Sequence, residues 1–306
     1  MTDSPVAAFT LATLQAGAVL IPAIGAAGAY WPLAAAAPAG FAGLDTDIKG
    51  VLVNWPVAFP ALRDYAAACS SGGVPRSDAI DASRANLALP IQYPNKLVAI
   101  GANYEDHLRE MNATIPKGAH PVMFIKPPTT ALCGPGKVQI PDGCAQFDWE
   151  VELAVVIGKR MRKVSRALAM DGVAGYSIGV DYTARDYLFP KDYFFKADFL
   201  LGKGQDGTTP LGPVIAPAAF IRDPHDLRIT LSVNGVIKQN ASTAGMIFRV
   251  DEQLSSISQF VTLEPGDVVL TGSPAGVGLP RGEFLKPGDH VIATAEGIGE
   301  LRMEIA

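Results

Sequence analysis

The sequence predicts a β-rich α+β protein, with a small N-terminal α+β domain over residues 1–90 and a larger domain over residues 91–306. The chain has 306 residues, and at about 150 residues per domain this length suggests roughly two domains. Its 31 glycines and 24 prolines follow no collagen-like period and indicate many turns. Short apolar runs of strand length also outnumber helical patterns, most clearly after residue 89.

The composition excludes several classes of protein. Hydrophobic residues make up 49% of the chain and charged residues 18%, which is enough apolar material for a core and excludes disorder as the main state. The net charge of −5 provides no basic field to attract nucleic acid. Cys69, Cys133 and Cys144 form no C-x-x-C motif and no metal-binding spacing, so we expect free thiols in a reducing, cytoplasmic protein.

Residues 4–44 carry no charged side chain, which raises the question of a signal peptide or a membrane span. A secretory signal needs a positive start, whereas the first basic residue is Lys49. Prolines and glycines interrupt the stretch, so it lacks the roughly 20 continuous apolar residues of a spanning helix. Two strand-like runs, 9–14 and 18–24, instead predict a small buried hairpin, and Pro22 should place the second strand at an edge or a bulge. We therefore expect no membrane association.

The remaining elements follow from periodicity and turn residues. Residues 46–69 have apolar side chains at helical spacing, and the Ser-, Gly- and Pro-containing residues 70–75 predict a linker. Asn234-Gly235, between two apolar runs, is typical of a hairpin with a primed turn. Strands are expected at 96–101, 122–125, 151–157, 176–180, 229–233 and 268–270, and helices at 106–111, at 165–171 with Ser165 as N-cap, and at 250–260.

Three carboxylates adjoin the predicted strands of the larger domain. Glu150 and Glu152 are two residues apart in a strand, so their side chains share a face, and Asp181 ends another apolar run. Buried carboxylates repel one another and lose hydration unless protons or a cation compensate. Three oxygen ligands suit a hard ion such as Mg²⁺ or Mn²⁺. The alternative is that Glu150 and Glu152 form the wet face of an edge strand.

Three further motifs contain candidate functional residues. His107 and Glu110 are three residues apart, so on a helical turn the carboxylate would orient the imidazole as a base for water; an ordinary surface helix is the alternative. Arg185 and Lys203 could hold a substrate carboxylate. The glycine-rich turn 271–278 follows a strand and can present backbone N–H groups and hydroxyls to an anion.

Five motifs, in this order, resemble the fumarylacetoacetate hydrolase family. They are G-x-N-Y-x-x-H-x-x-E from Gly101, W-E-V-E-L-A-V-V-I-G-K from Trp149, D-Y-T-A-R-D from Asp181, L-G-K from Leu201 and L-T-G-S-P-x-G-V-G from Leu270. The resemblance extends from residue 96 to the C-terminus. It implies a mixed β-roll, a homodimer, and a Mg²⁺ or Mn²⁺ ion held by carboxylates.

The resemblance also implies a role for residues in each motif, with the His–Glu pair on a lid segment that orders over the substrate. The metal ligands would be Glu150, Glu152 and Asp181, the catalytic residues His107, Glu110 and the substrate-anchoring Lys203, and the substrate contacts Tyr104, Arg185, Gly272 and Ser273. Two positions depart from the family pattern. Ala102 stands where some members, including acylpyruvate hydrolases, have arginine, and Ser273 replaces a common threonine. These departures leave the substrate open.

We therefore predict a Mg²⁺- or Mn²⁺-dependent hydrolase that cleaves a C–C bond in a 2,4-dioxo acid of the acylpyruvate or diketo-deoxy-acid type. His107, oriented by Glu110, would deprotonate a water that attacks the distal carbonyl, and bond cleavage would leave a metal-bound enolate. The alternatives are a decarboxylase or tautomerase of a 2-oxo (2-hydroxy-enoic) diacid in aromatic catabolism, and a dehydratase of a sugar-derived 2-oxo-3-deoxy acid. The retained carboxylates and His–Glu pair argue against a non-catalytic binding protein.

Two other motif matches lack the required context. Gly175-Tyr176-Ser177-Ile178-Gly179 matches the nucleophile elbow of serine hydrolases, but the residues that follow do not begin a helix. Residues 202–207 match a dinucleotide-binding fingerprint, but the prolines after them forbid the helix that it must open. The other histidines, His120, His225 and His290, have no ligand-like partners nearby and are expected in turns or at the surface.

Overall fold

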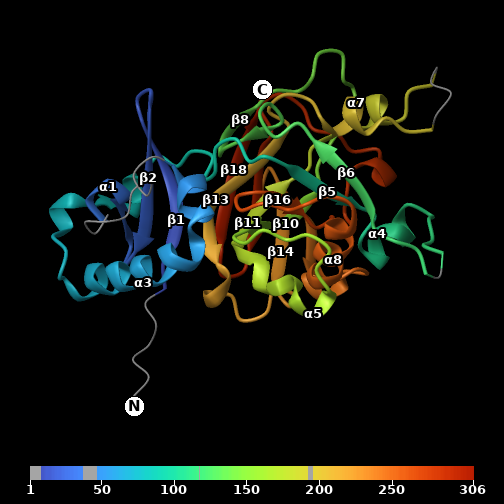
Figure 1. Ribbon diagram of the computed structural model, residues 1–306. Helices are drawn as coiled ribbons and strands as arrows, with labels where there is room; N and C mark the ends of the chain where they lie inside the picture. Colours follow the sequence, from blue (N-terminus) through green and yellow to red (C-terminus); the bar gives the residue numbers. More distant parts are fainter. Residues whose placement is uncertain (1–7, 37–46, 117, 192–195) are drawn as a thin grey trace.

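We analysed a computed structural model of the chain, which describes residues 8–36, 47–116, 118–191 and 196–306. Figure 1 shows a smaller N-terminal part beside a larger β-rich part. An eleven-stranded sheet connects them, in the order β4-β3-β2-β1-β13-β11-β10-β16-β5-β6, with β7 paired to β13. A second, five-stranded sheet has the order β15-β14-β17-β18-β8. The β-rich α+β fold predicted from the sequence is confirmed.

The N-terminal part contains the predicted hairpin, and two of its three helices lie in the region with helical spacing. Its strands are β1 (Thr10–Ala16), β2 (Val19–Ala26), β3 (Ala29–Pro32) and β4 (Ile80–Asp81), and its helices are α1 (Leu33–Ala36), α2 (Ile48–Val53) and α3 (Trp55–Ser71). The edge position predicted from Pro22 is wrong, because β2 lies between β1 and β3. The β2–β3 ladder ends at the pair Ala23↔Pro32 and does not include Pro22. Pro22, which has no N–H to donate, is therefore accommodated in β2. The uncharged stretch is described only over residues 8–36, and the first residue of the predicted 46–69 helix lies outside the described residues.

The larger part contains most of the strands. They are β5 (Leu97–Gly101), β6 (Val122–Lys126), β7 (Leu132–Cys133), β8 (Gly136–Val138), β9 (Phe147–Asp148), β10 (Val151–Ile157), β11 (Val173–Val180), β12 (Thr183–Ala184), β13 (Thr209–Pro217), β14 (Arg228–Val233), β15 (Val236–Ser242), β16 (Val268–Leu270), β17 (His290–Ala295) and β18 (Gly299–Ile305). Asn234 and Gly235 both have positive φ, of 51° and 80°, which confirms the primed turn between β14 and β15.

The helices of the larger part are short, apart from one. They are α4 (Glu105–Glu110), α5 (Arg166–Ala169), α6 (Arg185–Leu188), α7 (Phe199–Lys203) and α8 (Val250–Phe260). The expected helix at 250–260 is confirmed, and that at 165–171 continues as a 3-10 turn over Met170–Gly172. Ser165 is at the N-cap position of α5, but its side chain makes no capping hydrogen bond. The sequence patterns did not predict α6 and α7, because four or five residues are too few to show periodicity.

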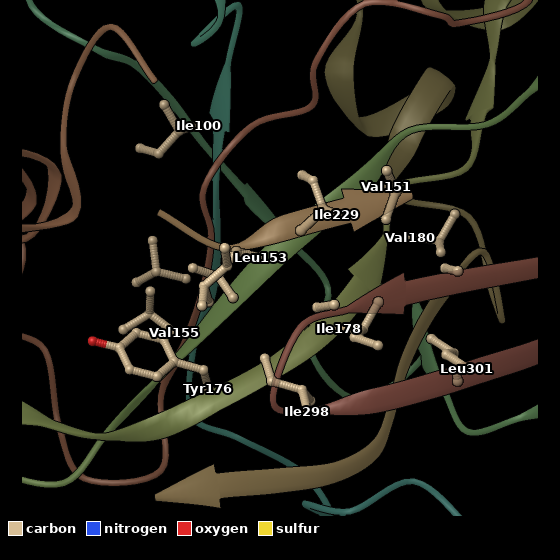
Figure 2. Packing of buried hydrophobic residues seen from close by; sticks show 14 of the residues in the cluster. Ile100, Val151, Leu153, Val155, Tyr176, Ile178, Val180, Ile229, Ile298 and Leu301 are labelled. Carbon is tan, nitrogen blue, oxygen red and sulfur yellow. The ribbon is translucent and has the colours of Figure 1, made fainter. Parts of the chain in front are cut away.

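The core follows the two faces of the central strand β10. Leu153 and Val155 face the second sheet and pack in one cluster with Ile178, Ile229 and Leu301 (Figure 2). The alternate residues, Ala154 and Val156, belong to a second cluster that includes residues of β1, β2 and α3. The strand is therefore covered on both sides, which excludes the wet edge strand considered for Glu150 and Glu152. The described residues of the segment 1–90 share this cluster and the large sheet with the rest of the chain. The treatment of this segment as a separate domain stays a prediction.

The structure also explains the two competing motif matches. Ser177 lies in the middle of β11, where its hydroxyl donates to the carbonyl of Val214 at 2.8 Å, so it is not on a strand-to-helix elbow. The glycine motif 202–207 lies at the end of α7 and leads into strand β13, so it does not open a helix. Among the described residues, we find no helix long and apolar enough to cross a membrane.

His225 lies in a turn, as the sequence predicts, but its side chain is buried against the start of α8 and is not at the surface. Its Nε2 accepts the backbone N–H of Val250 at 3.1 Å, and Arg249 contacts its Nδ1 at 2.8 Å. The imidazole therefore caps an orphan donor in the first turn of the helix. Sequence spacing did not show this, because the Val250 amide is 25 residues away along the chain.

Replacing His225 by Gln should reduce the loss of stability on acidification. Burial and the nearby Arg249 lower the pKa of His225 below 6.5, although Asp223 and Asp251 oppose this. The unfolded chain therefore binds a proton that the folded protein does not, so stability falls as the pH decreases through the unfolded pKa. The difference between urea midpoints at pH 8 and pH 5.5 should be smaller in His225→Gln than in the wild type. An equal difference would contradict the role of His225.

Candidate active site

Three carboxylates meet at one end of the β10–β11 pair. Glu150 immediately precedes β10, Glu152 is its second residue, and Asp181 immediately follows β11. The antiparallel register Val151↔Val180 brings them together, and the backbone N–H of Asp181 donates to the carbonyl of Glu150 at 2.9 Å. All three side chains are buried, and each offers an oxygen within 4.8 Å of those of the others. The expected metal-binding group is therefore assembled in space.

Basic side chains compensate two of these three carboxylates. Lys203 Nζ lies 2.7 Å from Glu150 Oε2 and 2.6 Å from Asp181 Oδ2. Lys126, from the end of β6, also donates to Asp181. Arg185 Nη2 lies 2.6 Å from Glu150 Oε1. Within the described part of the chain, Glu152 has no ion-pair partner and accepts a hydrogen bond from the Gly272 N–H at 2.6 Å.

The pKa values of Glu152 and Glu150 are shifted in opposite directions, which distinguishes the carboxylate without a cationic partner from the one with two. Burial raises the pKa of Glu152 well above its usual value, and the charges of Asp181 and Glu150 raise it further. Burial acts in the same direction on Glu150, but Lys203 and Arg185 outweigh it and lower the pKa of Glu150 to about 2. A divalent cation next to Glu152 would remove the repulsion that disfavours its ionised form. The donor set of three carboxylates therefore fits a hard ion such as Mg²⁺ or Mn²⁺.

His107 and Glu110 form the predicted pair on α4. His107 Nδ1 lies 2.9 Å from Glu110 Oε1, and Glu110 Oε2 also accepts the Gly276 N–H at 3.0 Å. This geometry assigns the proton of a neutral imidazole to Nδ1 and leaves the lone pair on Nε2. His107 is largely buried. Its partner Glu110 is linked to Glu152 through the glycine-rich turn, because the Gly276 N–H donates to Glu110 and the Gly272 N–H donates to Glu152. The arrangement can accept and return a proton.

The glycine-rich turn connects α4 to the carboxylate cluster. The Gly272 N–H donates to Glu152, and the Gly276 N–H donates to Glu110. The Gly278 N–H donates to Asp148 at 2.6 Å. Gly272 and Gly276 have φ of +95° and +109°, which side-chain residues rarely adopt. A Cβ at Gly272 would also lie 2.6 Å from Asn103 Cβ. Glycine is required because the turn packs directly on neighbouring chain segments.

The predicted substrate contacts have different surroundings. Tyr104 is fully buried, and its hydroxyl has no hydrogen-bond partner among the described residues. Arg185 donates Nε to Asp148 at 2.9 Å and Nη2 to Glu150, so these two donors are occupied by carboxylates. Ser273 is buried on the glycine turn and accepts a hydrogen bond from Gln239 at 2.8 Å. Lys203 and Arg185, which were expected to hold the substrate, therefore both contact proposed metal ligands.

Four buried residues of this region were not predicted from the sequence: Lys126, Asp148, Asn103 and Gln239. Asp148 is two residues before Glu150, so the period-two argument for Glu150 and Glu152 could have been extended to it. Asn103 lies in the G-x-N-Y motif, and its side-chain amide donates to the carbonyls of Phe248 and Thr271. Lys126 and Gln239 gave no sequence signal, because their partners are far away along the chain.

Replacing Lys126 by Met should destabilise the metal-free protein by about 3–5 kcal/mol, because it leaves part of the Asp181 charge buried and uncompensated. The loss should be smaller in the presence of Mn²⁺, which would supply positive charge at the same carboxylate. Urea unfolding with EDTA and with Mn²⁺ measures both values. Lys137→Met is the control, since Lys137 is exposed and its nitrogen is 3.8 Å from Glu304. Equal losses with and without Mn²⁺ would contradict this account of Lys126.

Comparison with known proteins agrees with this geometry. The sequence profile of the fumarylacetoacetate (FAA) hydrolase C-terminal domain matches residues 96–306. Mitochondrial oxaloacetate tautomerase FAHD2A of Bos taurus is 41% identical over 220 residues, which are 71% of this chain and 68% of that protein. The profile match lies in the larger part of the chain, which contains the carboxylates and the His–Glu pair.

Two solved structures extend the comparison to the fold. Fumarylacetoacetate hydrolase of Exiguobacterium antarcticum is 29% identical with a TM-score of 0.78, and the match covers 97% of this chain and 99% of that one. Fumarylpyruvate hydrolase of Pseudomonas aeruginosa, in complex with Mn²⁺ and pyruvate, is 29% identical with a TM-score of 0.63, over 71% of this chain and 91% of that one. The profile match, the relatives and the shared fold together show that the chain is an enzyme of the fumarylacetoacetate hydrolase family.

Proposed function

We propose that this enzyme uses Mg²⁺ or Mn²⁺ to transfer a proton between carbon and oxygen in a 2-oxo dicarboxylate, which makes it a tautomerase of oxaloacetate-type acids. The observation that carries the proposal is the His107–Glu110 pair, which the glycine-rich turn links to the buried carboxylate cluster. Among the described residues, His107 Nε2 makes no hydrogen bond. The 41% identity with an oxaloacetate tautomerase supports this reaction class. The sequence predicts this reaction as an alternative to C–C hydrolysis.

The side chains have distinct tasks in this reaction. Glu150, Glu152 and Asp181 would hold the divalent ion, which when bound supplies a Lewis acid for the 2-oxo and carboxylate oxygens of the substrate. His107 Nε2 removes a proton from the carbon next to the 2-oxo group, or returns one to it. Glu110 fixes the imidazole and stabilises its charged form. Lys203 stays protonated, since burial is outweighed by Asp181 and Glu150 and its pKa is raised, and it neutralises negative charge beside the substrate.

A second candidate is hydrolysis of a C–C bond in a 2,4-dioxo acid, the reaction predicted first from the sequence. The same His107 Nε2 could deprotonate a water molecule for attack on the distal carbonyl. The related fumarylpyruvate hydrolase, whose structure contains Mn²⁺ and pyruvate, favours this candidate, because hydrolysis of an acylpyruvate releases pyruvate. Both candidates use a small-molecule 2-oxo acid. The homodimer and the cytoplasmic location stay predictions.

Product analysis separates these candidates. The Mn²⁺-loaded protein is incubated with enol-enriched oxaloacetate, acylpyruvates and 2-oxo-3-deoxy-aldonates, and NMR identifies the products. Faster conversion of enol into keto oxaloacetate supports the tautomerase, whereas pyruvate with a second carboxylic acid supports the hydrolase. Release of CO₂ would identify a decarboxylase. Buffer containing Mn²⁺ alone is the control, and rates equal to that control for all substrates would contradict the proposal.

A further inference from the structure

Gln239 connects the glycine turn to the strand that contains two proposed metal ligands. It lies in β15, with no exposed surface, at a β-bulge: Leu231 pairs with Gln239 and Ser232 with Ile237, which leaves Lys238 as the extra residue. A bulge redirects a side chain, and here the amide of Gln239 is directed into the protein toward β10 and the turn. The proposed proton transfer does not involve Gln239.

The amide of Gln239 has only one orientation that satisfies its neighbours. Its Oε1 accepts the backbone N–H of Val151 at 2.9 Å, between Glu150 and Glu152. Its Nε2 donates to the carbonyl of Pro274 at 2.8 Å and to Ser273 Oγ at 2.8 Å. Exchanging the oxygen and nitrogen would place a donor against the Val151 N–H and an acceptor against the Pro274 carbonyl. The Gln239–Ser273 hydrogen bond therefore runs from the amide to the hydroxyl.

This direction determines what the Ser273 hydroxyl can do. An oxygen that accepts from Nε2 keeps its own proton for another acceptor. Within the described residues, Ser273 Oγ makes no other hydrogen bond. The turn that contains it is held between the carboxylate cluster and α4, because Gly272 donates to Glu152 and Gly276 donates to Glu110. An anionic substrate oxygen in this space would meet a hydroxyl that points a proton toward it.

We propose that Gln239 is a positioning residue, which fixes the Ser273 hydroxyl as a hydrogen-bond donor to an anionic oxygen of the 2-oxo acid. The inference rests on the proposed function, in which Ser273 contacts the substrate. Two further features show that β15 and the glycine-rich turn pack closely together. Gly276 packs so closely that a Cβ would lie 2.2 Å from the Lys238 carbonyl. The bulge at Lys238 also places Gln239 opposite Leu231 instead of in solvent.

A double-mutant cycle tests this coupling. Gln239→Met removes the donor with little change in volume, and it should raise KM for the accepted 2-oxo acid about tenfold, the equivalent of one lost hydrogen bond. In a Ser273→Ala background, the same substitution should change KM less than about twofold, because the hydroxyl that it orients is absent. If the two single effects multiply instead, Gln239 has only an independent structural role, and the proposal is wrong.

A second variant covers the case in which Gln239→Met does not fold. Gln239→Glu keeps the acceptor for Val151, but when ionised at pH 8 it accepts the Ser273 proton that the substrate would receive. It should also raise KM about tenfold, with unchanged Mn²⁺ affinity by calorimetry. Gln92→Glu is the matched control, since the Gln92 amide only donates to the carbonyl of Leu89, outside the site. An unchanged KM in Gln239→Glu would overturn the proposal.

Ligand binding separates this proposal from the proposed function. Oxalate is a planar dianion that resembles an enolised 2-oxo acid, and its affinity for the Mn²⁺-loaded protein can be measured without turnover. Gln239→Glu and Ser273→Ala should each weaken oxalate binding about tenfold, and the double variant should bind no more weakly than Ser273→Ala. If the wild type converts no 2-oxo acid, the proposed function fails while oxalate binding still decides the role of Gln239. Equal oxalate affinity in all variants would refute that role.

Discussion

Replacing Glu152 by Gln should abolish metal binding and activity, yet stabilise the metal-free protein. Glutamine removes one of three carboxylate ligands, so Mn²⁺ affinity should fall by more than the roughly 10- to 100-fold lost when an outer-shell partner is removed. The metal-free fold should gain stability because Glu152 is the carboxylate without a cationic partner among the described residues, and its ionised form is disfavoured there. Calorimetric Mn²⁺ titration and thermal unfolding in EDTA measure the two effects.

The sign of the stability change also depends on pH. Burial and the neighbouring carboxylates Asp181 and Glu150 raise the pKa of Glu152 above its usual 4.5, so the metal-free folded protein retains a proton that the unfolded chain has lost. Stability is therefore lost as the pH rises from the unfolded pKa through the folded one. Glu152→Gln removes this loss, so its advantage over the wild type in EDTA should be larger at pH 8 than at pH 5. No stabilisation at either pH would contradict the uncompensated charge.

Glu150→Gln is the matched control, because it removes the same charge from a residue with cationic partners. Arg185 and Lys203 both contact the Glu150 carboxylate in a buried environment. Removal of that charge should destabilise the metal-free protein by about 3–5 kcal/mol, the usual cost of breaking a buried ion pair. Both variants should bind metal poorly and lack activity. Opposite effects on stability would distinguish Glu150, which Arg185 and Lys203 neutralise, from Glu152, whose charge requires a bound cation.

Replacing His107 by Ala should eliminate proton transfer and leave metal binding intact. A positioned acid or base contributes about 10²- to 10⁴-fold to a rate, so kcat should fall by that factor. Mn²⁺ affinity should change little, because His107 contacts Glu110 and lies outside the three-carboxylate group. Steady-state kinetics with the substrate identified by NMR, together with calorimetric Mn²⁺ titration, measure both quantities.

Two further variants serve as comparisons for His107→Ala. Glu110→Gln should lower kcat less than His107→Ala, because the amide can still contact Nδ1 but no longer stabilises the charged imidazole. His290→Ala, at the exposed start of β17, should have wild-type kinetics. A wild-type rate in His107→Ala would remove this residue from the proton-transfer role, whereas loss of Mn²⁺ binding in the same variant would indicate a wider structural defect.

Local patterns were sufficient for much of the fold. The alternation at 9–14, the Asn-Gly turn and the apolar run after Glu150 predicted the first hairpin, the β14–β15 hairpin and the central strand. These features depend on residues close together in the chain, where side-chain direction follows backbone period. The edge position predicted from Pro22 was wrong. The sequence of the β1–β2 hairpin shows neither that β3 pairs with the other side of β2 nor that the β2–β3 ladder ends before it reaches Pro22.

The sequence by itself determined the types of chemical group at the site and which of them share a strand face, as Glu150 and Glu152 do. The tertiary structure decided how these groups are compensated. Lys126 and Lys203 are 55 and 22 residues from Asp181, and Gln239 is 88 residues from Val151, yet each pair is in hydrogen-bond contact. Charge compensation depends on distance in space and on burial, and strand order with packing sets both. For this reason the ligand pattern was predictable, whereas the uncompensated charge of Glu152 and the orientation of Ser273 were not.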